Sequence, residues 1–584
     1  MASSQPSPQR ARHISTWGLP VVCLLAGCVE PDPDLGRHEP APDTTDSGVD
    51  TEYTGQMDSA GQTDSAGDVW ETLPVASVPV CADQKHPAST LADAKQVALP
   101  DGGFYDAEDL APYLARFQLT LEPTPEDRVY VEATCEDGEH TLHRTVPVLD
   151  GHATVSLLPA GTRASCEVTL CGSDAASVTA QLETAAAQIP PFPTTPGDAT
   201  MPEAVSAADV VACGNGFQQQ GRSGGDESAL WCVDFAGRTV LHLPAPDPTA
   251  NKDSEVRWAV LEVDGTPQRV LLMNCGVHGP VAVTLDGRVI DLLTGEPWAS
   301  VGALYGFDLR NWDLELLGSL DPDMTALDPT STGGPDHNLA FLPGPNDVLA
   351  NYRVWGPEYS GTVVFEPERE VLSLFYTGVD AEVHTNAIDA LPIDDDTWLA
   401  GMSLFNAGSI VVLTYRDRSF TPLFRLGAGP GHLADLHQVV PSGGQDPPTG
   451  AHALKTERLQ RAEDGRLRLE FGVFNNWNTD PPSDTSAVER WAVTTDLVDI
   501  HTAERLVRIE TGRHSYGGGG QDQERLPDAT LLIAYVEGWD SGFYSELTVG
   551  VYDDVAGFSP LFTASLEDTD GIFEPYSVGI ASLH

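Results

Sequence analysis

Four histidines stand at or near the start of an alternating apolar stretch: His278 in "CGVHGPVAVTL", His337 in "PDHNLAFLP", His384 in "EVHTNAIDAL" and His452 in "GAHALKTERL". Successive histidines of this set lie 47 to 68 residues apart. A neutral imidazole can act as a nucleophile, and it can also accept or donate a proton near neutral pH. If the fold brings the four together, they could carry nucleophilic and acid–base chemistry on one ligand.

The same histidines could instead have a structural or a metal-binding role. Each imidazole could cap a turn or fill a satisfied, half-buried position without any chemical task. Imidazole is also a common zinc ligand. Equivalent positions in successive repeat units, however, usually lie too far apart for one small ion. We therefore expect no metal and no cofactor at this set.

The elements that would position the histidines are short strands. Each histidine-led stretch is followed by a turn, such as "LDG", "LPGPND", "LPIDDD" or "AEDG", and then by a second strand. Units of this length with four short strands each are typical of a β-propeller, and residues 204–584 have room for about six blades. Equivalent positions of the blades would then converge on one channel. A pair of β-sandwiches is the alternative, and it accounts for the periodicity less well.

The region before the repeats has a different character. Residues 73–190 contain shorter alternating stretches, among them "ARFQLTLEP", "DRVYVEATCE" and "ASCEVTLCG", which Pro, Gly and Asp separate. This pattern predicts a small antiparallel β-sandwich. Residues 191–203 are rich in proline and predict a linker. The fold class we expect is all-β, a six-bladed β-propeller preceded by a β-sandwich domain.

The N-terminus carries an export pattern. Residues 1–28 combine a short basic region with the apolar run "WGLPVVCLLAGC", which is too short to span a membrane. Leu25-Ala26-Gly27-Cys28 resembles a bacterial lipobox, and this implies cleavage before Cys28 and lipidation of its thiol. The mature protein would then be held by a lipid anchor at the outer membrane or in the periplasm. An ordinary secretory signal with a coincidental cysteine is the alternative.

Composition limits the partners. The formal net charge is -56, from 87 acidic against 31 basic residues, which excludes nucleic acid as a partner. An anion would need a local cluster of basic or N–H groups. Residues 29–72 contain few large apolar residues and predict a disordered acidic tether. Seven cysteines follow Cys28, an odd number without a C-x-x-C pair, so we expect disulfides, at least one unpaired thiol and no zinc knuckle.

Several motifs occur in an order that is similar to that of a known family. "HTNAIDAL" carries His384, Asn386 and Asp389. "HNLAFLPG" places a histidine before a Leu-Pro-Gly turn that is similar to a Leu-Pro-x-Gly turn, and "FRLGAGPG" precedes a histidine that stands before "FNNW". In the N-terminal part, "LLPAGTRASCEVTLCG" is followed by "ETAAAQIPPFPTT". Over most of residues 75–584 the chain resembles the bacterial arylsulfate sulfotransferases.

The resemblance implies a reaction and residues for it. An exported enzyme would transfer a sulfuryl group from an aryl sulfate donor to a phenolic acceptor, through a sulfohistidine intermediate and without a cofactor. His452 would be the nucleophile. His337 and His384 would bind sulfuryl oxygens and assist the phenol proton, and Asn386 would position an oxygen. His278 is a further candidate for substrate binding.

The sequence departs from the family where the family carries arginines. Met402 and Ala487 hold those places, and Arg490, one pleat from Ala487, is the candidate substitute for substrate binding. His437 competes with His452 for the nucleophile's role but lies farther from "FNNW". Two alternatives to the transferase follow: a non-catalytic, surface-anchored β-propeller that binds a ligand or a protein partner, and a hydrolase that uses the same histidines.

Overall fold

A computed structural model describes the chain as almost entirely β-structure, with two short α-helices, α1 (Ala107–Leu110) and α2 (Asp380–Val383), in its described part. The prediction of an all-β chain is confirmed. None of the helices in that part is long and apolar enough to cross a membrane. The described residues are 70–583 without 76, 80, 82–83, 85–88, 101–103, 126–127, 174–176, 187–191, 203–204, 221–226, 245, 247–254, 275–279, 293–312, 325–331, 343–346, 356–358, 367–370, 430, 477–484, 500, 512–518, 527–529, 539–544, 554–555, 566–570 and 576–577.

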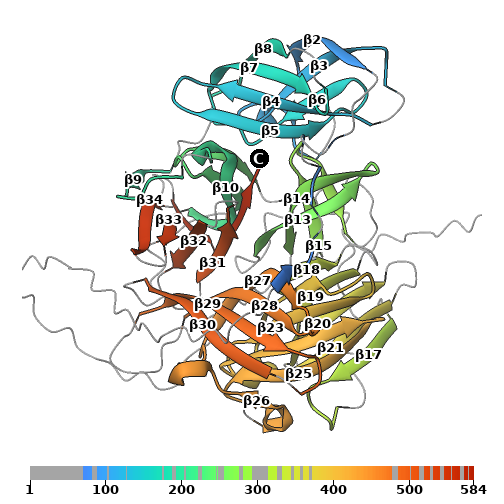
Figure 1. The fold of residues 1–584 in the computed structure, drawn as a ribbon, viewed down its shortest axis with the longest axis vertical. Helices are drawn as coiled ribbons and strands as arrows, with labels where there is room; N and C mark the ends of the chain where they lie inside the picture. The colour runs from blue at the N-terminus through green and yellow to red at the C-terminus, as the bar shows by residue number, and fades with distance from the viewer. Residues whose placement is uncertain are drawn as a thin grey trace, which may run out of the picture. The chain divides into compact units, whose positions relative to one another are not determined.

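Two antiparallel sheets, here called the N-terminal sheet pair, share one hydrophobic core (Figure 1). Strict alternation creates that core: in "RASCEVTL" of β7, every second residue is buried. The disulfides Cys81–Cys171 and Cys135–Cys166 lie in this part of the chain. The strands are β2 (Thr90–Val97), β3 (Ala115–Glu122) and β6 (His152–Val155) in one sheet, and β5 (Thr141–Pro147), β4 (Tyr130–Glu136), β7 (Arg163–Leu170) and β8 (Val178–Glu183) in the other.

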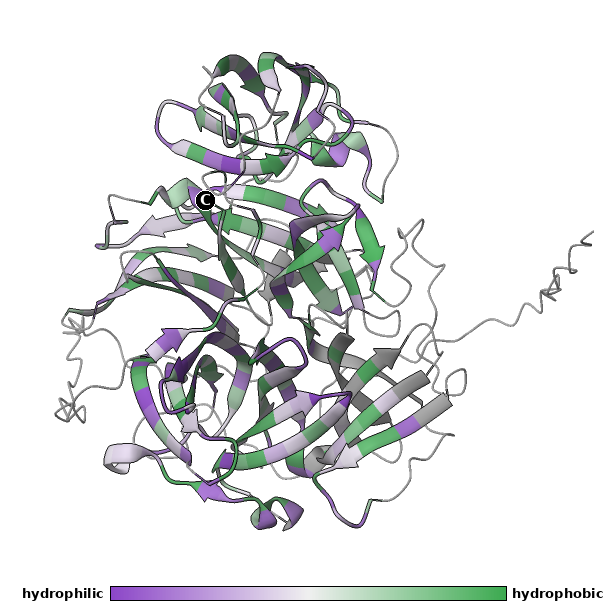
Figure 2. Cartoon of the chain, turned by 45° about the vertical axis from the view of Figure 1, so that its right-hand side comes forward, coloured by the Kyte–Doolittle hydropathy of each residue, from purple (hydrophilic) through white to green (hydrophobic). Residues whose placement is uncertain are grey.

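Six further sheets follow, and we number them I to VI. Their central strands contain nearly continuous apolar runs, such as the buried "SIVVL" of β24, and Figure 2 shows hydrophobic colouring along many of the strands. Such runs are typical of sheets that are covered on both faces. Sheet I contains β10 (Val210–Gln220), β11 (Glu227–Asp234) and β12 (Thr239–Pro244). Sheet II contains β13 (Val256–Val263), β14 (Thr266–Asn274), β15 (Pro280–Thr284) and β16 (Val289–Asp291). Sheet III contains β17 (Asp313–Ser319), β18 (Thr332–Leu342), β19 (Asp347–Trp355), β20 (Tyr359–Glu366) and β21 (Val371–Val379).

Sheets IV to VI complete the chain. Sheet IV contains β22 (Thr385–Pro392), β23 (Thr397–Leu404), β24 (Ser409–Arg416), β25 (Ser419–Gly427) and β26 (Gln438–Val439). Sheet V contains β27 (Ala451–Ala462), β28 (Leu467–Asn475), β29 (Ala487–Thr495) and β30 (His501–Glu510). Sheet VI contains β31 (Gly519–Arg525), β32 (Leu531–Gly538), β33 (Ser545–Asp553) and β34 (Gly557–Ser565).

Each numbered sheet contacts the next, and the last contacts the first. The contacts join β13 to β10, β14 to β18, β18 to β22, β22 to β27, and β27 to β31. Strand β31 then contacts β36 (Gly579–Ser582), which pairs with β10 of sheet I together with β35 (Gly571–Pro575). The C-terminal strands therefore complete the sheet that residues 210–244 begin, and Cys213–Cys232 joins two strands of the same sheet.

Two segments expected to lack regular structure contribute short strands. In the expected tether 29–72, β1 (Trp70–Thr72) pairs with the end of β27, and the guanidinium of Arg466 lies 5.7 Å from the Trp70 ring centroid. In the expected linker 191–203, β9 (Thr194–Pro196) pairs with β34 (Figure 1). Both corrections have one cause, since an exposed outer edge or strand end of a sheet offers backbone partners that local composition cannot reveal.

Candidate functional site

Two of the four predicted histidines meet at one aromatic ring. His384 directly precedes β22, and His452 is the second residue of β27. The ring centroid of Phe405, in the turn after β23, lies 6.1 Å from that of His384 and 4.3 Å from that of His452, with both pairs edge-on. His452 is 4% exposed. Sheets IV and V therefore bring these two imidazoles to a shared phenyl ring.

The other two members of the set are less informative. His337 lies inside β18 rather than at its start, because the backbone of 332–335 already pairs with β19 before the register shifts. The expectation that each histidine begins a strand is therefore wrong for His337, and its side chain lies outside the described part. His278 lies outside the described residues, as do Cys28 and Cys275.

The two motifs assigned to the nucleophile are adjacent in the fold. His452 pairs with Phe474 across β27 and β28, and Ala451 pairs with Asn475. The competing His437 is exposed at β26, the outer edge of sheet IV, where its ring centroid lies 5.5 Å from that of His501. Burial, and then the neighbouring His437, lower the pKa of His501. Between the two candidate nucleophiles, the geometry favours His452 as the residue beside "FNNW".

Asn386 belongs to a set of three buried asparagines that join neighbouring sheets. Its Oδ1 accepts a hydrogen bond from the backbone N–H of Ala453 in sheet V at 3.3 Å. In the same way, the side chain of Asn338 bonds both backbone groups of Ile388 in sheet IV at 3.0 Å, and Nδ2 of Asn274 donates to the carbonyl of Asn338 at 3.1 Å. All three asparagines are 0% exposed.

These bonds give Asn386 a structural task that sequence reasoning missed. The available signal was the recurrence of asparagine in "LMNC", "DHNL" and "HTNA", of which only the last was singled out. A buried amide that bonds a neighbouring backbone satisfies groups that would otherwise be costly to bury. The proposed contact of Asn386 with a substrate oxygen stays a prediction.

Charged side chains from four sheets meet where β13, β22, β27 and β31 come together. Nε and Nη2 of Arg257 donate to Oε2 of Glu255 at 3.1 and 2.9 Å, and Nη1 lies 3.3 Å from Oδ2 of Asp389. Nζ of Lys455 donates to Oδ2 of Asp522. We call these five residues the axial cluster. Every cation in it already has a carboxylate partner from its own chain.

Burial is the largest influence on the pKa of the two buried carboxylates of the axial cluster. It raises the pKa of Glu255 to about 6, although Arg257 opposes the shift, and it also raises the pKa of Asp522 against the effect of Lys455. A cavity of about 10 Å³ lies among Glu255, Arg257, Lys455 and Asp522, with the buried side chain of Gln521 beside them. That volume is roughly the minimum for one water molecule and far below that of an aryl sulfate.

The positions expected to supply or replace the family's arginines do not offer a free cation. Met402 is fully buried in a hydrophobic cluster with Ile388 and Leu433, so it faces a core and not a channel. Ala487 is also buried, at the start of β29. Arg490 is buried as well, and carboxylates of this chain already neutralise its guanidinium.

Arg490 is held by two carboxylates of sheet V. Its Nε donates to Oε2 of Glu457 at 2.6 Å, and its Nη2 donates to Oε2 of Glu470. Burial disfavours the charged guanidinium, but these two carboxylates raise its pKa overall. An anionic ligand at Arg490 would therefore have to compete with two charges that are already in place.

Comparison with known proteins gives no relative by sequence. No family model matches the chain, and no curated protein matches it. Among solved structures, AofleA from Arthrobotrys oligospora is 9% identical, with a TM-score of 0.31 over 63% of this chain and 89% of its own. The NanB sialidase from Streptococcus pneumoniae is also 9% identical, with a TM-score of 0.22 over 81% and 86% of the two chains. Scores this low carry no argument about fold or function.

Proposed function

We propose that this chain is an exported six-bladed β-propeller that binds a ligand or partner and does not transfer a sulfuryl group. The six blades would be sheets I to VI. Support for this comes from the contacts of each sheet with the next, and from the last strand, which returns to sheet I and would close the ring. Closure by a strand from the far end of the chain leaves no open sheet edge inside such a ring.

One observation carries the choice of binding over catalysis. In the described part of the axial region, Arg257, Lys455 and Arg490 are all paired with carboxylates of this chain. Sulfuryl transfer develops charge on the departing phenolate, and a donor that stabilises such charge typically contributes about 100- to 1000-fold in rate. Donors that are neutralised in advance give little of that stabilisation.

The proposal is tested by turnover of 4-nitrophenyl sulfate by the purified mature protein, with and without added phenol. We expect the release of 4-nitrophenolate to equal the buffer rate in both conditions. Release that requires the protein and accelerates with phenol would overturn the proposal. Release of 4-nitrophenolate that requires the protein but has the same rate with and without phenol would instead favour a hydrolase.

A second candidate function, sulfuryl transfer, has one specific observation in its favour. Phe405 contacts both His384 and His452, and His452 pairs with Phe474 of the "FNNW" stretch. In that reaction the imidazole nitrogen of His452 would form a bond to sulfur while the sulfur–oxygen bond to the aryl group breaks. The phenol would then take the sulfuryl group from the nitrogen and lose its proton.

We also propose that the protein is a lipoprotein of the cell envelope, anchored through Cys28. The three disulfides of the described residues are compatible with an oxidising compartment, where such bonds persist. The lipobox-like residues 25–28 lie outside the described residues, so the anchor rests on the sequence alone.

A further inference from the structure

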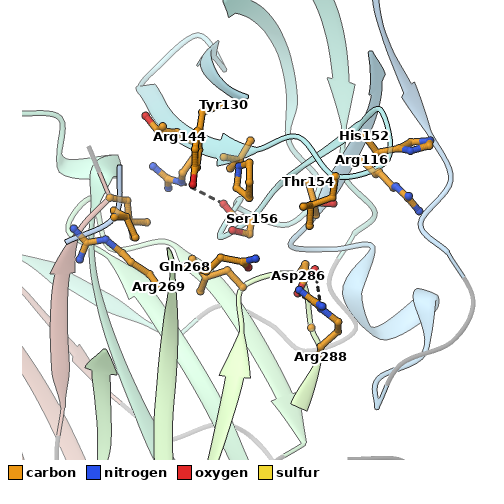
Figure 3. A pocket seen from close by; sticks show the side chains of 18 of the residues that line it. Arg116, Tyr130, Arg144, His152, Thr154, Ser156, Gln268, Arg269, Asp286 and Arg288 are labelled. Atoms are coloured by element: carbon orange, nitrogen blue, oxygen red, sulfur yellow. Dashed lines mark hydrogen bonds and ion pairs between the residues drawn. The ribbon is translucent and has the colours of Figure 1, made fainter. Parts of the chain in front are cut away.

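A cavity of about 300 Å³ lies where the N-terminal sheet pair faces sheet II, and the function proposed above makes no use of it. Arg116, Tyr130 and Arg144 line it from the sheet pair, and Arg269 and Arg288 line it from sheet II (Figure 3). A volume near 300 Å³ is at the lower end of the range for small-molecule sites. We call this cavity the arginine pocket.

Specific bonds join the N-terminal part of the chain to sheet II and to the neighbouring sheet I. Nη1 of Arg128 donates to Oγ1 of Thr266 at 3.0 Å. The hydroxyl of Tyr105 donates to the carbonyl of Pro244 at 2.9 Å. On the pocket's own lining, Arg144 donates to Oδ1 of Asp209 at 2.9 Å. The pocket is thus preformed between elements that are fixed to one another.

The charge of the lining is opposite to that of the chain. Acidic residues outnumber basic ones by 87 to 31 in the sequence, yet the lining contains four arginines and a single carboxylate, that of Asp286. The carboxylate of Asp286 is already paired, because both of its oxygens accept hydrogen bonds from Nε of Arg288 at 3.1 Å. A random sample of this sequence would give the reverse ratio.

Two of the four arginines have no carboxylate or hydrogen-bond acceptor of their own within the described residues. Arg144 and Arg288 are paired, with Asp209 and with Asp264 and Asp286 respectively. Neither Arg116 nor Arg269 forms an ion pair or hydrogen bond in that part of the chain.

Arg269 is the more informative of the two unpaired arginines. Burial lowers the pKa of its guanidinium, and the more distant Glu524 offsets this only in part. A desolvated cation without an acceptor is costly to keep, and an anion that enters the pocket would remove that cost.

The remainder of the lining is apolar. Leu99, Leu110, Leu285 and Leu583 contribute aliphatic surface, and the buried ring of Tyr130 lies near Arg144 (Figure 3). A bare inorganic anion would leave this surface uncovered, and a neutral apolar molecule would leave the guanidinium groups unpaired. The lining therefore matches a molecule with both features.

We propose that the arginine pocket binds an amphipathic organic anion, with its carboxylate, sulfonate or phosphate head at Arg269 and its apolar ring or chain against the leucines. Arg116 lies at the opposite end of the pocket from Arg269 (Figure 3). The site is separate from the axial cluster and shares none of its residues. Its occupation would not require the histidines, so it is independent of whether the chain binds or transforms a ligand elsewhere.

The test is a fluorescence titration of the mature protein with 8-anilino-1-naphthalenesulfonate, compared with the neutral N-phenyl-1-naphthylamine. We expect saturable binding of the sulfonate at one site, weakened about tenfold by Arg269→Gln, a typical cost for one charge-assisted contact. Arg116→Gln, at the opposite end of the pocket, should change the affinity for the sulfonate much less. The neutral probe should bind these variants and the native protein equally. Displacement by 2-naphthoate, 2-naphthalenesulfonate and 2-naphthyl phosphate then ranks the head groups.

Arg163→Gln is the matched control, because Arg163 lies on the same sheet pair but is exposed and paired with Glu183 away from the pocket. Sulfonate binding that is unchanged in Arg269→Gln, or that falls equally in Arg116→Gln or Arg163→Gln, would overturn the proposal. If Arg269→Gln does not fold, Arg269→Met takes its place, because an aliphatic side chain suits a position that is largely removed from water. Arg116 is half-exposed and unpaired in the described part of the chain, so its replacement leaves no buried partner behind.

Discussion

Replacement of Arg257 by methionine would remove the cation that serves two carboxylates of the axial cluster. Glu255 is 2% exposed and would be left without its partner. Within the described residues, Asp389 would keep only its bonds from Thr456 at 2.8 Å. Removal of one member of a buried ion pair typically costs about 3–5 kcal/mol, because the remaining charge is uncompensated. We expect Arg257→Met to lower the free energy of unfolding by that amount at pH 7.5.

The destabilisation by Arg257→Met should depend on pH, and the direction of that dependence follows from the pKa of Glu255. Its pKa is about 6 in the folded chain against 4.5 as the ordinary value, so ionisation already works against the native fold. Stability from this group is greatest below pH 4.5 and falls as the pH rises towards 6, by about 2 kcal/mol at 1.36 kcal/mol per unit. Without Arg257 the folded pKa rises further, so the decline continues above pH 6.

Urea unfolding followed by tryptophan fluorescence measures both effects. Between pH 5 and pH 7.5 the destabilisation by Arg257→Met should grow by about 2 kcal/mol. Arg163→Met, at an exposed position, should change the free energy of unfolding by less than about 0.5 kcal/mol at either pH. A loss in Arg257→Met below about 1 kcal/mol, or one that is equal at the two pH values, would refute the role assigned to Arg257 in the axial cluster.

Three further expectations follow from single positions. Met402→Arg should destabilise the protein by more than about 3 kcal/mol in urea and give no sulfuryl transfer, since it places a charge among Ile388 and Leu433; a stable and active variant would show that position 402 faces a pocket after all. Asn386→Leu should cost about 1–3 kcal/mol, because it leaves the N–H of Ala453 unpaired, whereas an unchanged urea midpoint would leave a ligand contact as its only role. Cys28→Ala should remove acyl chains from the intact mass and release the protein from the membrane fraction, and retention there without acyl mass would contradict the proposed anchor.

The sequence was sufficient where local pattern determines structure. Alternation in "RASCEVTL" and similar stretches predicted the strands, and the short turns between them predicted an all-β chain. Equivalent places in the repeat predicted that four histidines would converge, and two of them, His384 and His452, lie at one ring, that of Phe405.

The remainder depends on partners that are distant in the sequence. Nothing near Met402 indicates that its strand buries it against sheet III, and nothing near Arg490 shows that Glu457 and Glu470 enclose it. The arginine pocket joins residues 116–144 with 269–288, and no motif connects two segments so far apart. Strands β1 and β9 formed for the same reason, since only the folded sheets supply their edges.

The most direct test of whether this protein accepts a sulfuryl group is intact-mass and peptide analysis after incubation with 4-nitrophenyl sulfate and no acceptor. We expect an unchanged mass for the native protein and for His452→Asn. A sulfuryl mass on the peptide that contains His452, absent from His452→Asn and discharged by added phenol, would contradict the proposal and establish the transferase.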